Sequence, residues 1–187
     1  NFSEDFNNIS DLSSIFSEKF AGSWSIQDGK LRLADHMDTD NQITYSYPPL
    51  LPAWQYNWPI NTSSTSALGI LEDTYITGDY NITVNMNVDD MGTGNAEAYI
   101  VLGEGSNPDT YYYAKISQSP NSNSLFKVVN GFPIKIGSIY QTINVGQDYT
   151  VGVNKQGNRI TILIDGNVAG IGYDNQDIPD GRIGFGS

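Results

Sequence analysis

The segment 79–88, "DYNITVNMNV", alternates apolar and polar residues without a break. Successive side chains of a β-strand point to opposite faces, so a period of two predicts a strand with one buried face and one solvated face. Such a strand is typical of a β-sandwich. The apolar set is Tyr80, Ile82, Val84, Met86 and Val88, and the polar set is Asn81, Thr83, Asn85 and Asn87.

The same alternation recurs near the end of the chain. One side of the segment 148–154 carries a tyrosine and two valines, and one side of the segment 158–165 carries three isoleucines. The residues between them, "KQGN" at 155–158, predict a tight turn between two antiparallel strands.

The other segments are also rich in β-branched and aromatic residues, which favour strands. Pairs such as Asn130-Gly131 and Asp165-Gly166 tolerate the positive φ of hairpin turns. Only the segment 11–20 offers a helical turn or two. We therefore expect one domain over residues 1–187, an all-β, two-sheet antiparallel sandwich of about a dozen short strands.

Composition excludes several classes of partner. With 21 acidic and nine basic residues, the chain has a net charge of −12 and repels phosphate backbones, so we expect no nucleic-acid binding. No apolar run approaches the roughly 20 residues of a membrane helix. The absence of cysteine excludes disulfides and thiolate chemistry. Abundant Asn, Ser, Thr, Gly and Tyr, with only 16% charged residues, suit an extracellular β domain.

Three parts of the sequence resemble a known family. The first part has "SEDFNN" followed by "GSWSIQDGKLRLAD", the middle has "GDYNITVNMNV" and "TYYYAKIS", and the end has "YTVGVNKQGNRITILIDGNVAG" and "PDGRIGFGS". In this order they resemble the concanavalin A-like lectin and glucanase jelly rolls, in particular laminin-G-like and carbohydrate-binding modules. The resemblance implies a jelly-roll fold and a polysaccharide or other glycan as partner. It also implies one module of a larger secreted or cell-surface protein, with possible neighbouring domains.

The segment "WQYNW" predicts a glycan-binding surface. Its three rings alternate with two amides, so in an extended loop the rings would project to one side. Sugar rings stack on aromatic planes, and their hydroxyls need fixed amides or carboxylates. The alternative is that this loop covers an open end of the sheet and buries its rings. The candidate binding residues are Trp54, Gln55, Tyr56, Asn57 and Trp58.

A second aromatic platform is expected in "DTYYYAK". On a strand, Tyr111 and Tyr113 share one face and Tyr112 takes the other. Whichever set faces outward could form part of a sheet-surface glycan site with Lys115 or Gln118. Tyr112 and Lys115 are the candidate ligand-binding residues of this platform.

Catalysis is the alternative to binding alone. Glucanases of this fold carry alternating acids on one strand, and none of the five glutamates begins such a pattern. Lyases of the fold use a tyrosine and a histidine near a uronate, which would assign acid and base roles to His36 and Tyr112. Non-catalytic carbohydrate binding is therefore the leading hypothesis. The alternatives are a polysaccharide lyase or hydrolase of the same fold, and a structural or adhesive cell-surface domain.

The acidic loops suggest one structural calcium ion, because calcium takes six to eight oxygen ligands from carboxylates and loop carbonyls. The resemblance implies a site near the first strand, with Glu4 as the first choice of ligand. For any single cluster, the alternative is a solvated acidic loop. The candidate ligands are Glu4 and Asp5, then Asp38 and Asp40; Asp35, Asp89 and Asp90 extend the set.

Overall fold

A computed structural model describes residues 12–20, 24–27, 30–33, 68–88, 97–105, 110–121, 123–130 and 132–186. These residues form strands throughout, apart from one 3-10 helix, Leu12–Ser14, and the connecting turns. Every strand pair is antiparallel. No helix among them is long and apolar enough to cross a bilayer.

Eleven strands form one sheet in the order β1-β4-β13-β6-β7-β8-β9-β12-β11-β10-β5, and β2 and β3 form a separate hairpin. The strands are β1 (Phe16–Phe20), β2 (Trp24–Gln27), β3 (Lys30–Leu33), β4 (Leu68–Ile76), β5 (Tyr80–Asn87), β6 (Glu97–Glu104), β7 (Tyr111–Ser117), β8 (Ser124–Val129), β9 (Phe132–Ile139), β10 (Asp148–Gln156), β11 (Arg159–Ile164), β12 (Asn167–Tyr173) and β13 (Gly181–Gly186).

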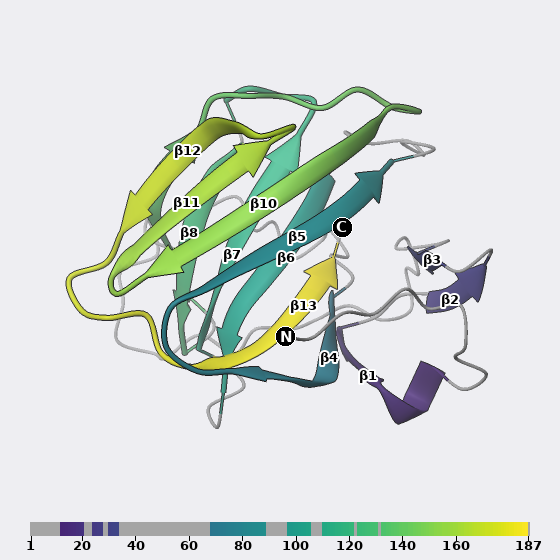
Figure 1. The fold of residues 1–187 in the computed structure, drawn as a ribbon, viewed down its shortest axis with the longest axis horizontal. Helices are drawn as coiled ribbons and strands as arrows, with labels where there is room; N and C mark the ends of the chain where they lie inside the picture. The colour runs from purple at the N-terminus through teal and green to yellow at the C-terminus, as the bar shows by residue number, and fades with distance from the viewer. Residues whose placement is uncertain are drawn as a thin grey trace, which may run out of the picture.

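The long sheet curls into two layers (Figure 1). Strands β12, β11, β10 and β5 lie in front of β8, β7 and β6. The layers are continuous along one side, where β12 pairs with β9. A Cβ atom on Gly137 would lie 2.4 Å from the carbonyl oxygen of Ile171, so only glycine permits this close approach. The predicted all-β jelly-roll sandwich is confirmed, with its two layers joined into one sheet.

The main core fills the space between the layers. The inward-facing side chains of β10 and β11 are nearly all inaccessible to solvent; Val151 and Ile162, for example, are both 0% exposed. Full burial of one such side chain stabilises a fold by about 1.5–3 kcal/mol. The faces predicted from the alternation of β5, β10 and β11 are confirmed, since their predicted apolar sets pack in or against this core.

Two predicted turns are also present. Gly157 has a φ of 55° in the turn between β10 and β11. Asp165 and Gly166 both have positive φ between β11 and β12, as a two-residue type I′ hairpin turn requires. The segment expected to offer a helical turn contains the 3-10 helix Leu12–Ser14 and then continues as β1.

Candidate functional site

The outward face of β6, β7 and β8 carries a second set of aromatic side chains, the outer aromatic cluster: Tyr99, Tyr111, Tyr113 and Phe126. The Tyr113 ring centroid lies 5.5 Å from that of Tyr99, 5.0 Å from that of Phe126 and 6.3 Å from that of Tyr111. Tyr111 and Tyr113 are buried, whereas Tyr99 and Phe126 are partly exposed. Lys115 places its Nζ 6.0 Å from the Tyr99 centroid. Partly exposed rings with a cation beside them are suited to contact a ligand.

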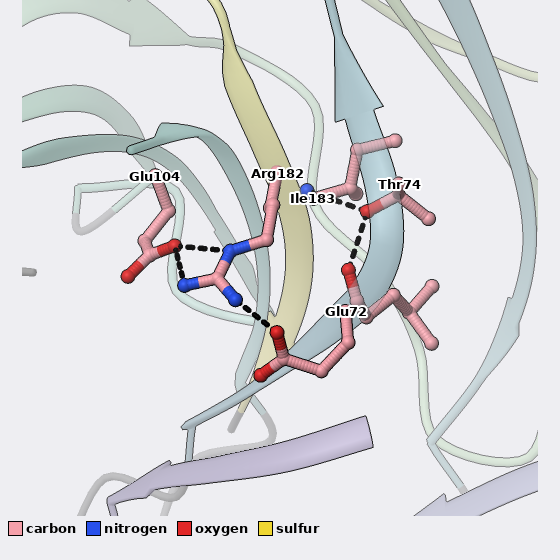
Figure 2. A network of polar contacts seen from close by, with 6 residues as sticks. Glu72, Thr74, Glu104, Arg182 and Ile183 are labelled. Carbon is pink, nitrogen blue, oxygen red and sulfur yellow. Dashed lines mark hydrogen bonds and ion pairs between the residues drawn. The ribbon is translucent and has the colours of Figure 1, made fainter. Parts of the chain in front are cut away.

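A charged network joins three strands of the same layer (Figure 2). Arg182 on β13 donates from Nε to Glu104 Oε2 on β6 at 2.8 Å, and its Nη2 lies 2.7 Å from the same oxygen. Its Nη1 donates to Glu72 Oε2 on β4. The Glu104 side chain is only 3% exposed, against 27% for Arg182 and 36% for Glu72. We refer to these three residues as the arginine network.

The arginine network holds its guanidinium firmly in the charged form. Burial alone would lower the pKa of Arg182, but the hydrogen bond and charge of Glu104, together with Glu72, raise it above its ordinary value. The three side chains thus form a fixed polar feature on this side of the sheet, with two carboxyl groups around one guanidinium.

A β-bulge brings Glu104 to this face. Arg182 pairs with Glu104 and Gly184 pairs with Val101, so two steps along β13 oppose three steps along β6. The extra residue is accommodated at Gly103, whose φ is 63°, a conformation that glycine adopts without strain. Without the bulge, alternation from Leu102 in the main core would direct residue 104 toward that core.

The adjacent edge of β13 is fixed by Thr74. Its hydroxyl donates to the Leu71 carbonyl at 2.7 Å and accepts from the Ile183 amide at 2.9 Å (Figure 2). The register between β4 and β13 shifts at this point. Thr74 therefore replaces the ladder hydrogen bonds that the shift removes, and it supports the strand that carries Arg182.

Tyr112 lies on the inward face of β7, opposite the outer aromatic cluster, at one end of the main core. Its ring is buried, and its hydroxyl donates to Asp174 Oδ2 at 2.5 Å, where Lys127 Nζ also donates at 2.6 Å. Burial alone would raise the pKa of Asp174, but the hydrogen bonds from Lys127 and Tyr112 lower it below its ordinary value. Burial and then the Asp174 hydrogen bond raise the pKa of Tyr112. These contacts tie β7 and β8 to the segment after β12.

Tyr112 and Lys115 were predicted to serve one platform, but they lie on opposite faces of β7 because their positions differ by an odd number. Lys115 lies beside Tyr99 on the outward face, and Tyr112 points into the main core. The tyrosines that share the face of Lys115 are Tyr111 and Tyr113.

The other predicted site residues fall outside the described residues and stay predictions. They are the loop residues Trp54, Gln55, Tyr56, Asn57 and Trp58, the conditional catalytic residue His36, and the calcium candidates Glu4, Asp5, Asp38 and Asp40. Within the part of the chain that the structure describes, no group of three or more acidic, histidine or cysteine side chains is placed to hold a metal ion.

The arginine network was not predicted from the sequence. Glu72 and Glu104 read as isolated acids, and Arg182 is 78 positions beyond Glu104. Only the strand order β4-β13-β6 brings the three together. The one local signal is the glycine before Glu104, because a glycine inside a strand pattern is typical of a bulge.

Comparison with known proteins identifies the fold of the chain. No protein-family model and no curated protein sequence matches the chain. Among solved structures, carbohydrate binding module CBM66 from Bacillus subtilis is similar with a TM-score of 0.65 at 13% identity, over 92% of this chain and 86% of that one. The chain has the concanavalin A-like jelly-roll fold.

Two further jelly rolls are similar at comparable level. One is a protein of unknown function with galectin-like fold from Bacillus subtilis, with a TM-score of 0.66 at 11% identity over 98% of this chain and 86% of that one. The other is a β-1,3-1,4-glucanase (lichenase) derived from a mouse hindgut metagenome, with a TM-score of 0.60 at 16% identity over 99% and 84%. At such identities the similarity establishes the architecture of the jelly roll and not its ligand.

Proposed function

We propose that the chain is a non-catalytic carbohydrate-binding module that holds a glycan on the outward face of β4, β13, β6, β7 and β8. The observation that carries the proposal is the presence of the arginine network and the exposed rim of the outer aromatic cluster on one sheet face. β6 contributes to both, with Glu104 in the network and Tyr99 in the cluster.

The cluster suits the apolar C–H face of a sugar ring, and the network suits its hydroxyl groups. A pyranose ring can lie against Tyr99 or Phe126 with its C–H face, and we take as the scale of this contact the about 0.5–1.5 kcal/mol that pairs of aromatic rings contribute beyond area burial. Sugar hydroxyls both donate and accept, so they can bind the partly exposed groups of the network, the Glu72 carboxylate and the Arg182 guanidinium. Lys115, beside Tyr99, adds a further donor.

The arrangement favours binding over hydrolysis. A glycosidase needs two carboxyl groups that flank the scissile bond, about 5 to 9.5 Å apart, with substrate between them. Here the Arg182 guanidinium lies between Glu72 and Glu104 and binds both (Figure 2). The space that a glycosidic bond would need between these two acids is therefore filled by a side chain.

Similar structures support a glycan-related role and supply the alternative. One is named as a carbohydrate binding module, which fits the proposal, and another is named as a glucanase, which fits hydrolysis. We extend the proposal to the loop residues Trp54 and Trp58 as further stacking rings, and to a secreted or cell-surface location for the module.

A matched pair of tyrosine variants tests the sheet surface. Tyr99→Ala should weaken binding to a retained glycan about fivefold, because about 1 kcal/mol of ring contact is lost. Tyr140→Ala is the control, since Tyr140 follows β9, is 84% exposed and does not belong to the cluster. Affinity electrophoresis against a panel of neutral and acidic polysaccharides measures both. Equal affinity of the two variants would contradict the proposed surface.

The loop and the enzyme alternative need a second experiment. Trp54→Ala/Trp58→Ala should also weaken retention if the loop contributes to the site. Incubation of the unmodified protein with the retained glycan, followed by a reducing-end assay and absorbance of unsaturated products, should show no turnover. Product that disappears in a His36→Ala variant would instead support the lyase alternative.

A further inference from the structure

The outward face of the front layer, which is turned toward the viewer in Figure 1, carries polar side chains in cross-strand pairs. Asn154 on β10 donates from Nδ2 to Asn81 Oδ1 on β5. Arg159 on β11 donates from Nη2 to Gln156 Oε1 on β10 at 3.0 Å. In the register between β10 and β11, Asn154 lies opposite Thr161, and Gln156 lies opposite Arg159. Asn154, Arg159 and Thr161 are thus neighbours on one face, and we refer to them as the front polar patch.

Three polar atoms of the front polar patch are buried and have no hydrogen-bond partner among the residues that the structure describes: Asn154 Oδ1, Arg159 Nε and Thr161 Oγ1. Thr161 faces outward, because Ile160 and Ile162 on either side of it are 0% exposed and lie in the main core. Thr161 itself is only 7% exposed, so its hydroxyl lies beneath the longer side chains around it. Buried polar groups of folded proteins nearly always have a partner. The patch therefore holds hydrogen-bonding capacity that the fold itself does not use.

The three atoms select the chemistry of a ligand. The amide oxygen of Asn154 only accepts and the Nε–H of Arg159 only donates, whereas the hydroxyl of Thr161 does both. An ionised carboxylate cannot donate to the Asn154 oxygen, and an ammonium group cannot accept from the guanidinium. The net charge of −12 also disfavours an anion. Adjacent hydroxyls both donate and accept, so a neutral sugar satisfies all three atoms.

Tyr173 adds an exposed ring beside the front polar patch. It lies opposite Arg159 in the register between β11 and β12, so the two side chains project from the same face. Tyr173 is 57% exposed, and Ile171, which lies opposite Thr161, is 40% exposed. An exposed ring next to groups that bind hydroxyls suits the C–H face of a sugar.

We propose that the front polar patch and Tyr173 form a second carbohydrate-binding site, for a neutral sugar with adjacent hydroxyls. One hydroxyl donates to Asn154 Oδ1 and a neighbouring hydroxyl accepts from Arg159 Nε, with the Thr161 hydroxyl beneath them. The sugar reaches these atoms when the solvent-exposed hydrogen bond between Arg159 and Gln156 opens, and surface side chains reorient within picoseconds to nanoseconds. The site lies on the opposite layer from the surface proposed above and does not depend on it.

The arginine side chains allow both surfaces to be followed in one experiment. The Nε–H groups of Arg32, Arg159 and Arg182 give their own signals in a proton–nitrogen NMR correlation spectrum. Titration with neutral oligosaccharides of glucose, galactose, mannose and fructose should shift the Arg159 signal to saturation with at least one of them. A shift of the Arg182 signal reports the surface proposed above. A shift of Arg182 alone would refute the second site and support the first, and a shift of Arg159 alone would do the reverse.

Thr161→Val tests the site through a single atom. Valine keeps the shape of threonine but lacks the hydroxyl, so the affinity measured at Arg159 should fall about fivefold. Thr83→Val is the matched control, because Thr83 is exposed on the same face, on β5, and lies outside the patch. Without sugar, Thr161→Val should keep or raise the urea midpoint, since the hydroxyl that it removes has no partner within the described chain. A hydroxyl with a purely structural role would lower the midpoint instead.

Three results would overturn the second site. The first is an Arg159 signal that moves with none of these oligosaccharides. The second is an equal loss of affinity in Thr161→Val and Thr83→Val. The third is a larger Arg159 shift with acetate or phosphate than with any sugar, which would assign the patch to an anion. Tyr99→Ala, which removes a ring of the other surface, should leave the Arg159 titration unchanged.

Discussion

Replacement of Arg182 by methionine should destabilise the fold by about 3 kcal/mol. Methionine keeps much of the aliphatic stem but leaves the Glu104 carboxylate, 3% exposed, without its guanidinium. Breaking a buried ion pair from one side costs about 3–5 kcal/mol, and we take the lower end because Arg182 is 27% exposed and solvent screens part of the interaction. Glu72→Gln should cost about 1 kcal/mol or less, since the Glu72 side chain is 36% exposed.

Urea unfolding at neutral pH measures both variants. A thermal melt gives a second measurement. For a chain of this length, 1 kcal/mol of stability corresponds to about 2–4 °C in melting temperature, so Arg182→Met should lower the melting temperature by about 6–12 °C. The double variant Arg182→Met/Glu104→Gln should be more stable than the sum of the two single changes by about 2 kcal/mol, since it removes the carboxylate charge that has lost its guanidinium. If Glu72→Gln costs as much as Arg182→Met, or if the double variant shows no coupling, the assigned burial of Glu104 is wrong.

Three further predictions concern acid, packing and metal. The pKa of Asp174 is lowered from 3.8, so its carboxylate contributes to the free energy of unfolding above that pH, and this contribution is lost as the pH falls through the folded-state pKa. Asp174→Asn should therefore flatten the acid-induced loss of stability, measured as urea midpoints below about pH 4. An unchanged slope would contradict this. Ile162→Ala in the main core should cost about 4 kcal/mol, against about 0.5 kcal/mol or less for Ile171→Ala on the exposed side of β12, both by urea unfolding. We propose that calcium stabilises the chain by about 2.7 kcal/mol when present at a hundredfold excess over its dissociation constant, and that Asp38→Asn/Asp40→Asn abolishes this shift in a thermal melt; a melt indifferent to calcium and chelator would end the proposal.

The layers of the fold could be predicted from the sequence, whereas the charged site could not. Alternation is a local property, so the inward faces of β5, β10 and β11 follow from residues two positions apart. The positive φ of Asp165 and Gly166 follows in the same way from a hairpin dipeptide. Each of these features is complete within a short segment.

The arginine network and the inward face of β7 depend on pairing between strands that are far apart in the sequence. Nothing within a few residues of Glu72 or Glu104 indicates that β13 inserts between their strands and brings Arg182 to both. Alternation also leaves open which face of β7 is inward. In the structure the ring of Tyr112 lies in the main core together with Leu102, and its hydroxyl binds Asp174. Tyr113 lies on the opposite face of β7.

The bulge at Gly103 lets β6 carry one residue more than β13 opposite it. Removal of that single residue would leave the glutamate directly after Leu102, and strict alternation would keep its carboxylate on the face opposite Leu102. A side chain at position 103, by contrast, would have to adopt a φ of 63°, a conformation that favours glycine. Among homologues of this chain, we therefore expect this position to be glycine or to be deleted, and other insertions and deletions to accumulate in exposed turns such as Asp165-Gly166.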